Sequence, residues 1–245
     1  MWAPLRERVQ ASLPPALLRA LKGARLSRRR ARVGALPPLP PQAGPALRAL
    51  HGAWRLAAAS GASAPGAAMA YHELEWQGLL LPGERPWAER WQTLRRITPY
   101  RGRRVLELGC NLGLLSTFLL KDAGAAAALA VDRNPLILAA AARTAAALGV
   151  TPTFRALDLD RDPDWEAALA AFRPDVVFAL SLFRWVHDQA RLMAFLGRCD
   201  ELIYEGHASA RTEWRRLRAA GFETITLIAT SERGRAILHC RKRAG

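Results

Sequence analysis

The 245-residue sequence lacks several features that mark specialised classes of protein. Its three cysteines, Cys110, Cys199 and Cys240, show no paired spacing, which argues against a disulfide framework and a zinc site. No apolar run approaches the ~20 residues that span a bilayer, because Gly, Pro and Arg interrupt the alanine-rich stretches. The first residues lack the compact apolar core of a secretion signal. These absences predict a cytoplasmic protein with no transmembrane segment and no metal.

Acidic residues are also scarce, and their distribution is uneven. The chain has 36 Lys and Arg against 21 Asp and Glu, a formal net charge of +15. Residues 1–70 hold 11 of the basic residues and one acid, Glu7, together with a proline-rich run at 37–41. The stretch from Ala57 to Ala68 is typical of a flexible linker. We therefore divide the chain into a basic, Pro/Ala-rich and partly flexible extension, residues 1–70, and one domain, residues 71–245.

The charge of the extension suggests partners of opposite sign. A loosely ordered tail is the simplest interpretation. Within residues 1–32, however, leucines flanked by Arg19 and Lys22 also fit a basic amphipathic helix on an anionic membrane surface, or a segment docked on the domain. RNA phosphate is a further candidate partner for such an arm.

The stretch from Val105 to Gly113, VLELGCNLG, is the most informative part of the sequence. An apolar strand stops at Gly109, the chain bends, and Gly113 precedes an apolar helix. Glycine at 109 allows a ligand to approach the backbone where a Cβ atom would block it. The helix that follows points unpaired N–H groups and the positive end of its dipole at the same space. Such a turn suits a nucleotide-like cofactor at the end of a first parallel strand.

Short apolar runs bounded by turn residues alternate with helical stretches through the rest of the domain, which predicts an α/β fold with a parallel sheet covered on both faces. Asn134 with Pro135, Asp162 with Pro163, and Ser209 mark helix starts. The helix after Ser209 is expected to turn Trp214 and Leu217 inward. Besides the strand before Gly109, the predicted strands are Ala128–Val131, Phe154–Asp158, Asp175–Leu180, Leu202–Glu205, Thr224–Ala229 and Ala236–Cys240.

The acidic-x-Gly-x-x-x-Gly spacing from Glu107 to Gly113 resembles the first motif of class I S-adenosylmethionine-dependent methyltransferases. It differs from the Gly-x-Gly-x-x-Gly of dinucleotide binders, which counts against a nicotinamide-dependent oxidoreductase. Five β–α steps and a closing hairpin over residues 100–243 also match the family's topology. The resemblance implies a doubly wound, mostly parallel, seven-stranded Rossmann-like sheet with an antiparallel last strand, and S-adenosylmethionine as the cofactor.

The resemblance also implies roles for residues at the matching positions. Glu107 would organise the loop or meet the cofactor's amino group through water, and Asp132 would hold the ribose hydroxyls. Asp158, with the backbone of Leu159, would receive the adenine amino group. Each of these acids has a structural alternative, because acids at strand ends also cap helices or pair with arginines. The full set of predicted cofactor-binding residues is Glu107, Gly109, Asn111, Gly113, Asp132, Asp158, Leu159 and Ser181.

The segment before the first strand supplies two further candidates. Residues 71–76 alternate as in a strand, residues 81–84 form a predicted turn, and Trp87 begins a helix that methyltransferases of this class place over the cofactor. Arg85 and Arg90 are candidates to bind a carboxylate, either of the cofactor or of an acidic acceptor. The alternative is that both belong to a solvated basic face.

Residues after the fourth and fifth strands of the parallel sheet are the acceptor-side candidates. His187 and His207 are candidate general bases, although a histidine near a strand end is more often structural. Trp185 and Glu205 are candidate acceptor contacts. Leu180 and Ser181 stand where amino-group methyltransferases of nucleic acid and protein carry an Asn/Asp-Pro-Pro-aromatic motif, which argues against that chemistry.

The hypothesis is therefore an S-adenosylmethionine-dependent methyltransferase that acts on an oxygen of a small or carbohydrate-linked, anionic acceptor. One alternative is a catalytically silent S-adenosylmethionine-binding adaptor that uses the basic arm. Another is a methyltransferase of RNA or its terminal phosphates, which the run from Leu180 to His187 weakly resembles.

Overall fold

The computed structural model describes residues 36–61 and 70–242, which contain two sheets and the helices around them. The strands alternate with helices from residue 104 to residue 230, as the apolar runs predict. The strands are β1 Ala70–Trp76, β2 Leu79–Leu81, β3 Gly83–Pro86, β4 Arg104–Leu108, β5 Ala127–Asp132, β6 Thr153–Ala156, β7 Val176–Leu180, β8 Glu201–Glu205, β9 Thr224–Thr230 and β10 Ala236–Arg241.

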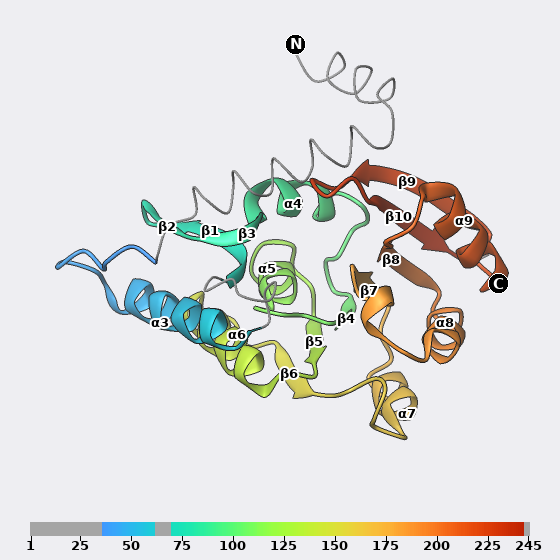
Figure 1. The fold of residues 1–245 in the computed structure, drawn as a ribbon, viewed down its shortest axis with the longest axis horizontal. Coiled ribbons are helices and arrows are strands. Elements are labelled where there is room, and N and C mark those ends of the chain that lie inside the picture. The colour runs from blue at the N-terminus through green and yellow to red at the C-terminus, as the bar shows by residue number, and fades with distance from the viewer. Residues whose placement is uncertain (1–35, 62–69, 243–245) are drawn as a thin grey trace, which may run out of the picture. The chain divides into compact units, whose positions relative to one another are not determined.

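The larger sheet has seven strands in the order β6-β5-β4-β7-β8-β10-β9 (Figure 1). Strands β4 to β8 are parallel, and β10 runs antiparallel to both β8 and β9. Parallel neighbours need crossover connections, and helices supply them here. The predicted doubly wound, mostly parallel sheet with an antiparallel last strand is therefore confirmed.

Helices flank the sheet, and several begin where the sequence signals place them. Asn134 caps α6, accepting hydrogen bonds from the N–H groups of Leu136 and Ile137, and Ser209 caps α9 through the N–H of Thr212. The helices are α3 Pro45–Ala59, α4 Trp87–Leu94, α5 Leu114–Asp122, α6 Pro135–Ala147, α7 Trp165–Ala170, η1 Phe183–Trp185 (a 3₁₀ turn), α8 Gln189–Leu196 and α9 Ala210–Ala219.

Two expectations about the helices are wrong. The Asp162-Pro163 signal does not start α7, which begins two residues later at Trp165. Trp214 does not face inward: it is 45 % exposed, and Arg218 packs over its ring. The buried face of α9 consists of Glu213 and Leu217, which are one turn apart, so Trp214 is rotated toward solvent.

Two hydrophobic clusters cover the opposite faces of the seven-stranded sheet. Val105 and Phe178 belong to the cluster that includes residues of α3 to α6, whereas Leu106 and Val177 belong to the cluster of α7, α8 and α9. Alternate residues of each strand therefore point to opposite faces, as the pleat requires. Burial on both faces explains why these strands read as continuous apolar runs.

The segment before β4 contributes a helix and a small sheet. Helix α3 packs along α6 (Figure 1), with Leu50 and Trp54 almost fully buried. The side-chain amide of Asn134 donates to the carbonyl oxygen of Ser60 at 3.1 Å, next to the end of β5. Residues 57–59, which the sequence places in a linker, are therefore the last residues of α3. The rest of that linker from residue 62, and residues 1–35 with their membrane and RNA predictions, lie outside the described residues. The division of the chain at residue 70 stays a prediction.

The small sheet has the order β2-β1-β3, with β1 antiparallel to β2 and parallel to β3. The predicted strand at 71–76 is confirmed by β1. The expected turn at 81–84 is wrong, because Gly83 and Glu84 already belong to β3. A Cβ atom on Gly83 would lie 2.0 Å from the carbonyl carbon of His72, so glycine permits this close strand contact.

Two kinds of feature are absent from the part of the chain that the structure describes. No helix in residues 36–61 and 70–242 combines the length and apolar character needed to cross a membrane. In the same residues, no three His, Cys, Asp or Glu side chains are grouped so that they could hold a metal ion.

Candidate active site

The glycine turn after β4 lies beside the end of β5. The backbone N–H groups of Gly109 and Cys110 both donate to the carbonyl oxygen of Val131 at 2.9 Å. Three residues of the turn have a positive φ angle: Gly109 at 72°, Asn111 at 50° and Gly113 at 61°. Glycine adopts this backbone conformation without steric cost, and asparagine tolerates it better than most residues. A Cβ atom on Gly113 would lie 2.4 Å from Cε1 of Phe154, so position 113 also requires glycine for space.

Asp132 ends β5 next to this turn. Its Oδ2 accepts the N–H of Asn111 and its Oδ1 accepts the N–H of Asn134, both at 3.0 Å. Burial raises the pKa of Asp132, and these backbone hydrogen bonds oppose the rise. Each carboxylate oxygen can accept more than one hydrogen bond, and the side chain is only half-buried. Asp132 therefore supports the turn and keeps capacity for a ligand.

Glu107 on β4 is buried beneath the start of α5. Its Oε2 accepts the N–H of Ser116 at 3.1 Å and the hydroxyl of Ser116 at 2.7 Å. Burial raises the pKa of Glu107 to about 7 in spite of these hydrogen bonds. The carboxyl group thus joins β4 to α5 and changes its charge near neutral pH.

Asp158 and Leu159 follow β6 on the far side of β5. Asp158 is half-buried, and its Oδ1 accepts the N–H of Asp160 at 3.0 Å. Its own N–H donates to Oδ2 of Asp162 at 2.8 Å, while the Leu159 side chain is buried. The loop is therefore shaped by its own acids, and parallel pairing of β5 with β6 places it at the same sheet edge as Asp132.

Arg85 and Arg90 converge on Glu205 at the end of β8. Nη2 of Arg85 lies 3.1 Å from Oε1 of Glu205, and Nη2 of Arg90 lies 2.6 Å from Oε2. All three side chains are buried. Burial alone would raise the pKa of Glu205, but Arg90 and then Arg85 outweigh that effect and lower it to about 2. Glu205 is therefore fixed as an anion by the chain's own arginines.

Arg85 and Arg90 differ in whether their N–H donors all have partners. Nε of Arg85 is paired with Glu232, and its Nη1 contacts Tyr71 at 3.0 Å and Ser181 at 3.3 Å, so its donors are occupied. Nη1 of Arg90 is buried without a hydrogen-bond partner among the described residues. Of these two arginines, Arg90 thus retains a buried donor for a ligand.

His207 is held two residues beyond β8 by a buried acid from α9. Its backbone N–H donates to Oε1 of Glu213 at 2.9 Å, and Oε2 of Glu213 accepts the hydroxyl of Tyr204 at 3.1 Å. A Cβ atom on Gly206 would lie 2.1 Å from that carboxylate, so glycine is needed between β8 and His207. The backbone of His207 is consequently well fixed.

The imidazole of His207 is neutral and has no protein partner. Both ring nitrogens are buried, and neither has a hydrogen-bond partner in the described part of the chain. Burial, followed by the positive charges of Arg235 and Arg184, lowers the pKa of His207 to about 4. A neutral imidazole with two unsatisfied nitrogens can accept one proton and donate another.

His187 and Trp185 lie farther outside. The side chain of His187 is 92 % exposed, and its Nδ1 lies 3.1 Å from Oδ2 of Asp160. Trp185 is 58 % exposed, and the guanidinium of Arg184 packs over its ring. Ser181 is buried, has φ at 57° and donates its N–H to the carbonyl oxygen of Glu205 at 2.8 Å. The structure therefore brings Ser181 and His207 to the end of β8 and leaves His187 in solvent.

Sequence reasoning missed several residues of this site. Glu213 carried one usable signal, its place in the first turn after the Ser209 cap, where an acid favours helix starts. Glu232 and Arg233, in the β9–β10 hairpin, are 147 and 149 residues from their partners Arg85 and Glu84. Pairing over such distances leaves no local pattern in a sequence.

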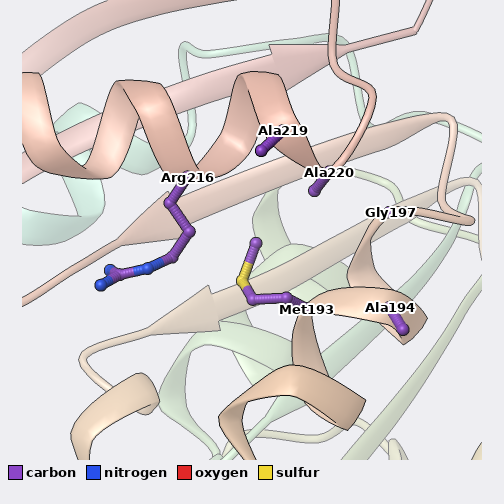
Figure 2. A pocket seen from close by; sticks show the side chains of 6 residues that line it. All are labelled: Met193, Ala194, Gly197, Arg216, Ala219 and Ala220. Atoms are coloured by element: carbon purple, nitrogen blue, oxygen red, sulfur yellow. The ribbon is translucent and has the colours of Figure 1, made fainter.

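A separate open pocket of about 430 Å³ lies between α8 and α9. Figure 2 shows Met193 and Arg216 extending toward this space from the two helices. None of the candidate cofactor or acceptor residues lines it, so it is distinct from the candidate active site. Its lining residues are Met193, Ala194, Gly197, Arg216, Ala219 and Ala220.

Comparison with known proteins identifies the fold. The crystal structure of EvdMO1 is similar at a TM-score of 0.57 and 20% identity, over 69% of this chain and 44% of that chain. The N-terminal domain of EvdMO1 with SAH bound gives 0.54 and 16% identity, over 70% of this chain and 90% of that one. A protein of the NADB-Rossmann superfamily from Streptococcus agalactiae gives 0.50 and 18% identity, over 64% and 69% of the two chains.

This chain thus spans less than half the length of EvdMO1 and most of the length of its N-terminal domain. No protein-family model matches the sequence. No curated protein matches it either. The strand order, the antiparallel β10 and the similar structures agree with the resemblance carried by the glycine turn, and the chain has the Rossmann-like fold of the class I S-adenosylmethionine-dependent methyltransferases.

Proposed function

We propose that this protein is an S-adenosylmethionine-dependent methyltransferase that acts on an oxygen atom of a small or carbohydrate-linked, anionic acceptor. One observation carries the proposal. The carboxyl ends of the parallel strands meet at one edge of the sheet. At this edge lie the glycine turn, the carboxylates of Asp132 and Asp158, and the neutral imidazole of His207, which has no hydrogen-bond partner among the described residues. In open parallel sheets this edge is where ligands bind.

The residues at the edge match the parts of the cofactor. The unpartnered Nη1 of Arg90 suits its carboxylate, and Glu107 suits its ammonium group. Asp132 can accept the ribose hydroxyls with the lone pairs that Asn111 and Asn134 leave free.

The remaining predicted residues fit secondary roles. Gly109 and Gly113 shape the turn, and Asn111 holds it against Asp132. We assign the adenine to Asp158 and the backbone of Leu159, because they follow β6, which pairs in parallel with β5. Ser181 contributes its hydroxyl to Arg85 and so borders the space where cofactor and acceptor would meet.

For methyl transfer, the protein has to orient the acceptor toward the methyl group and remove one proton from the acceptor. The cofactor supplies a methyl group that its sulfonium already activates. Holding a nucleophile in line with that methyl group can lower the barrier by about 7–11 kcal/mol. A hydroxyl acceptor also needs a base, and we assign this role to His207 because its imidazole is neutral and unpartnered at neutral pH. His187 is less suited, since it is exposed and already paired with Asp160.

Methyl transfer from labelled cofactor to fractionated cell extract tests this function. The proposal expects label in a small-molecule or glycan fraction and a mass increase of one methyl group in the product. Cofactor binding without any labelled product would favour the silent adaptor, and label in RNA would favour an RNA methyltransferase. The cytoplasmic location stays a prediction from cysteine usage.

A further inference from the structure

We propose that Arg184 and Arg235 together bind an oxyanion of the methyl acceptor, either a carboxylate or a phosphate or sulfate ester, beside His207. This inference rests on the proposed function and assigns the substrate class of the same site. The sequence alone points to Arg85 and Arg90 for this task. The ion pairs in the structure favour Arg184 and Arg235 instead.

The charged side chains around the end of β8 fall into two groups. Those of the first group have an ion-pair partner, and those of the second have none among the described residues. Glu205 has both Arg85 and Arg90, and Glu232 also pairs with Arg85. A third acid, Glu84, pairs with Arg233 at 2.8 Å. Each of these three acids therefore has at least one arginine partner, and Arg85 is shared between Glu205 and Glu232.

Arg184 and Arg235 are the arginines near the end of β8 that belong to the second group. Neither lies within ion-pair distance of a carboxylate in residues 36–61 and 70–242. Arg184 is exposed and packs over the ring of Trp185, with its Cζ 5.1 Å from the ring centroid, which restricts the guanidinium. Arg235 is half-buried. A half-buried guanidinium without a counter-ion favours a ligand that brings one.

Both arginines flank the end of β8. Arg184 follows β7, which pairs with β8 in parallel, and Arg235 directly precedes β10, which pairs with β8 on its other side. Their charges both act on the imidazole of His207, which follows β8 at the same end. Guanidinium groups carried on two sides of one strand end suit the several oxygens of an oxyanion.

Such an oxyanion would also change the basicity of His207. The charged groups that act on the imidazole are Arg235, Arg184, Glu205 and Glu213, and the two arginines lower its pKa while the two acids raise it. A bound anion offsets the arginines and moves the pKa of His207 back toward its ordinary value. A neutral acceptor would leave His207 a weak base. An acceptor that carries an oxyanion would instead make His207 more basic when it binds.

Histidine NMR on the full chain tests the inference without any turnover. The His207 resonance is assigned by its loss in His207→Gln, and its pKa is then measured with and without sodium sulfate, against sodium chloride at equal ionic strength. Sulfate stands for the ester class, and sodium benzoate at pH 7 stands for the carboxylate class. The variants are Arg184→Gln, Arg235→Gln and both together, with Arg215→Gln on the exposed face of α9 as the matched control.

The inference expects each of Arg184→Gln and Arg235→Gln to raise the pKa of His207 before any anion is added. Sulfate should raise it in the wild type and in Arg215→Gln, and at least one anion should bind saturably at pH 7. The double variant should bind that anion at least about tenfold more weakly, as loss of charged hydrogen bonds implies. The anion that binds more tightly names the class.

An unmoved His207 resonance with both anions, or equal binding by the double variant, would overturn the inference. Calorimetry with S-adenosylhomocysteine on the same samples keeps this result separate from the proposed function. Binding of S-adenosylhomocysteine without an anion response refutes the oxyanion site alone. An anion response without binding of S-adenosylhomocysteine refutes the methyltransferase instead.

Discussion

Nη2 of Arg90 on α4 lies 2.6 Å from Oε2 of Glu205 on β8, and both side chains are buried. The pair joins the segment before β4 to the last parallel strand of the seven-stranded sheet. Burial of an ion pair gives little net stability, but removal of one partner leaves an uncompensated charge inside the protein. The fold is therefore sensitive to a change of charge at this contact.

Glu205→Gln should lower the free energy of unfolding at pH 7 by about 3–5 kcal/mol, because buried Arg90 loses its counter-ion and buried Arg85 loses one of its two carboxylate partners. The pKa of Glu205 is depressed from 4.5 to about 2, so its contribution is complete above 4.5 and is lost as the pH falls toward 2. Urea denaturation at several pH values measures this. The exposed Glu223→Gln is the control, and a Glu205→Gln curve that coincides with it at pH 7 would contradict the assignment.

The sequence was sufficient for the sheet and insufficient for this pair. Strands buried on both faces appear as apolar runs, and caps such as Asn134 and Ser209 act within three residues of their own position. Parallel topology then places Asp132 and Glu205 at one edge without any further information. Local chemistry and a known chain order were enough to predict these positions.

The partner of each charge was not predictable in the same way. Arg85 and Arg90 read as free cations in the sequence, yet they bind an acid more than a hundred residues away. Trp214 was misplaced for a related reason, since the buried position on α9 is taken by Glu213, an acid that a hydrophobic pattern excludes. The roles of the individual cofactor and acceptor residues stay predictions.

Binding of S-adenosylhomocysteine should depend on pH through Glu107. The pKa of this buried carboxyl is raised to about 7, and the ligand's ammonium group favours the ionised form. Binding must then release a proton at lower pH, so affinity should fall below pH 7 by up to about tenfold per pH unit. Glu107→Gln, which keeps an oxygen for Ser116, should bind with little change between pH 6 and pH 8. Calorimetry of both proteins at several pH values measures this dependence. If affinity changes with pH to the same extent in both, Glu107 is excluded as the source of the pH dependence.

Gly113→Ala should be more damaging than Gly149→Ala, although both glycines have positive φ angles of 61° and 79°. At Gly149 no atom lies within 4 Å of an added Cβ, so only backbone strain of about 1–2 kcal/mol is expected. At Gly113 the Cβ also meets the ring of Phe154 at 2.4 Å, and overpacking adds about 1–3 kcal/mol. Urea denaturation of the two variants gives the difference directly. Equal losses would show that the turn relaxes around the ring.

His207→Gln should lower kcat for the labelled acceptor by about 10²–10⁴-fold, the usual contribution of a general base. Its affinity for S-adenosylhomocysteine should not change, because the backbone contact with Glu213 is retained. His187→Gln is the matched control and should keep nearly full activity, since that side chain is exposed. If the His187 variant loses activity and the His207 variant keeps it, the two roles are reversed.

The central claim is that the glycine turn after β4 and the carboxylate that ends β5 hold the cofactor. The most direct measurement is calorimetry with S-adenosylhomocysteine on the wild type, Asp132→Ala and Asp175→Ala. Asp175 also accepts a backbone N–H, from Arg104, but next to the start of β4, at the opposite edge of the sheet. We predict binding by the wild type and by Asp175→Ala, and strongly weakened binding by Asp132→Ala. Equal affinity in all three proteins, or no binding by the wild type, would contradict the claim.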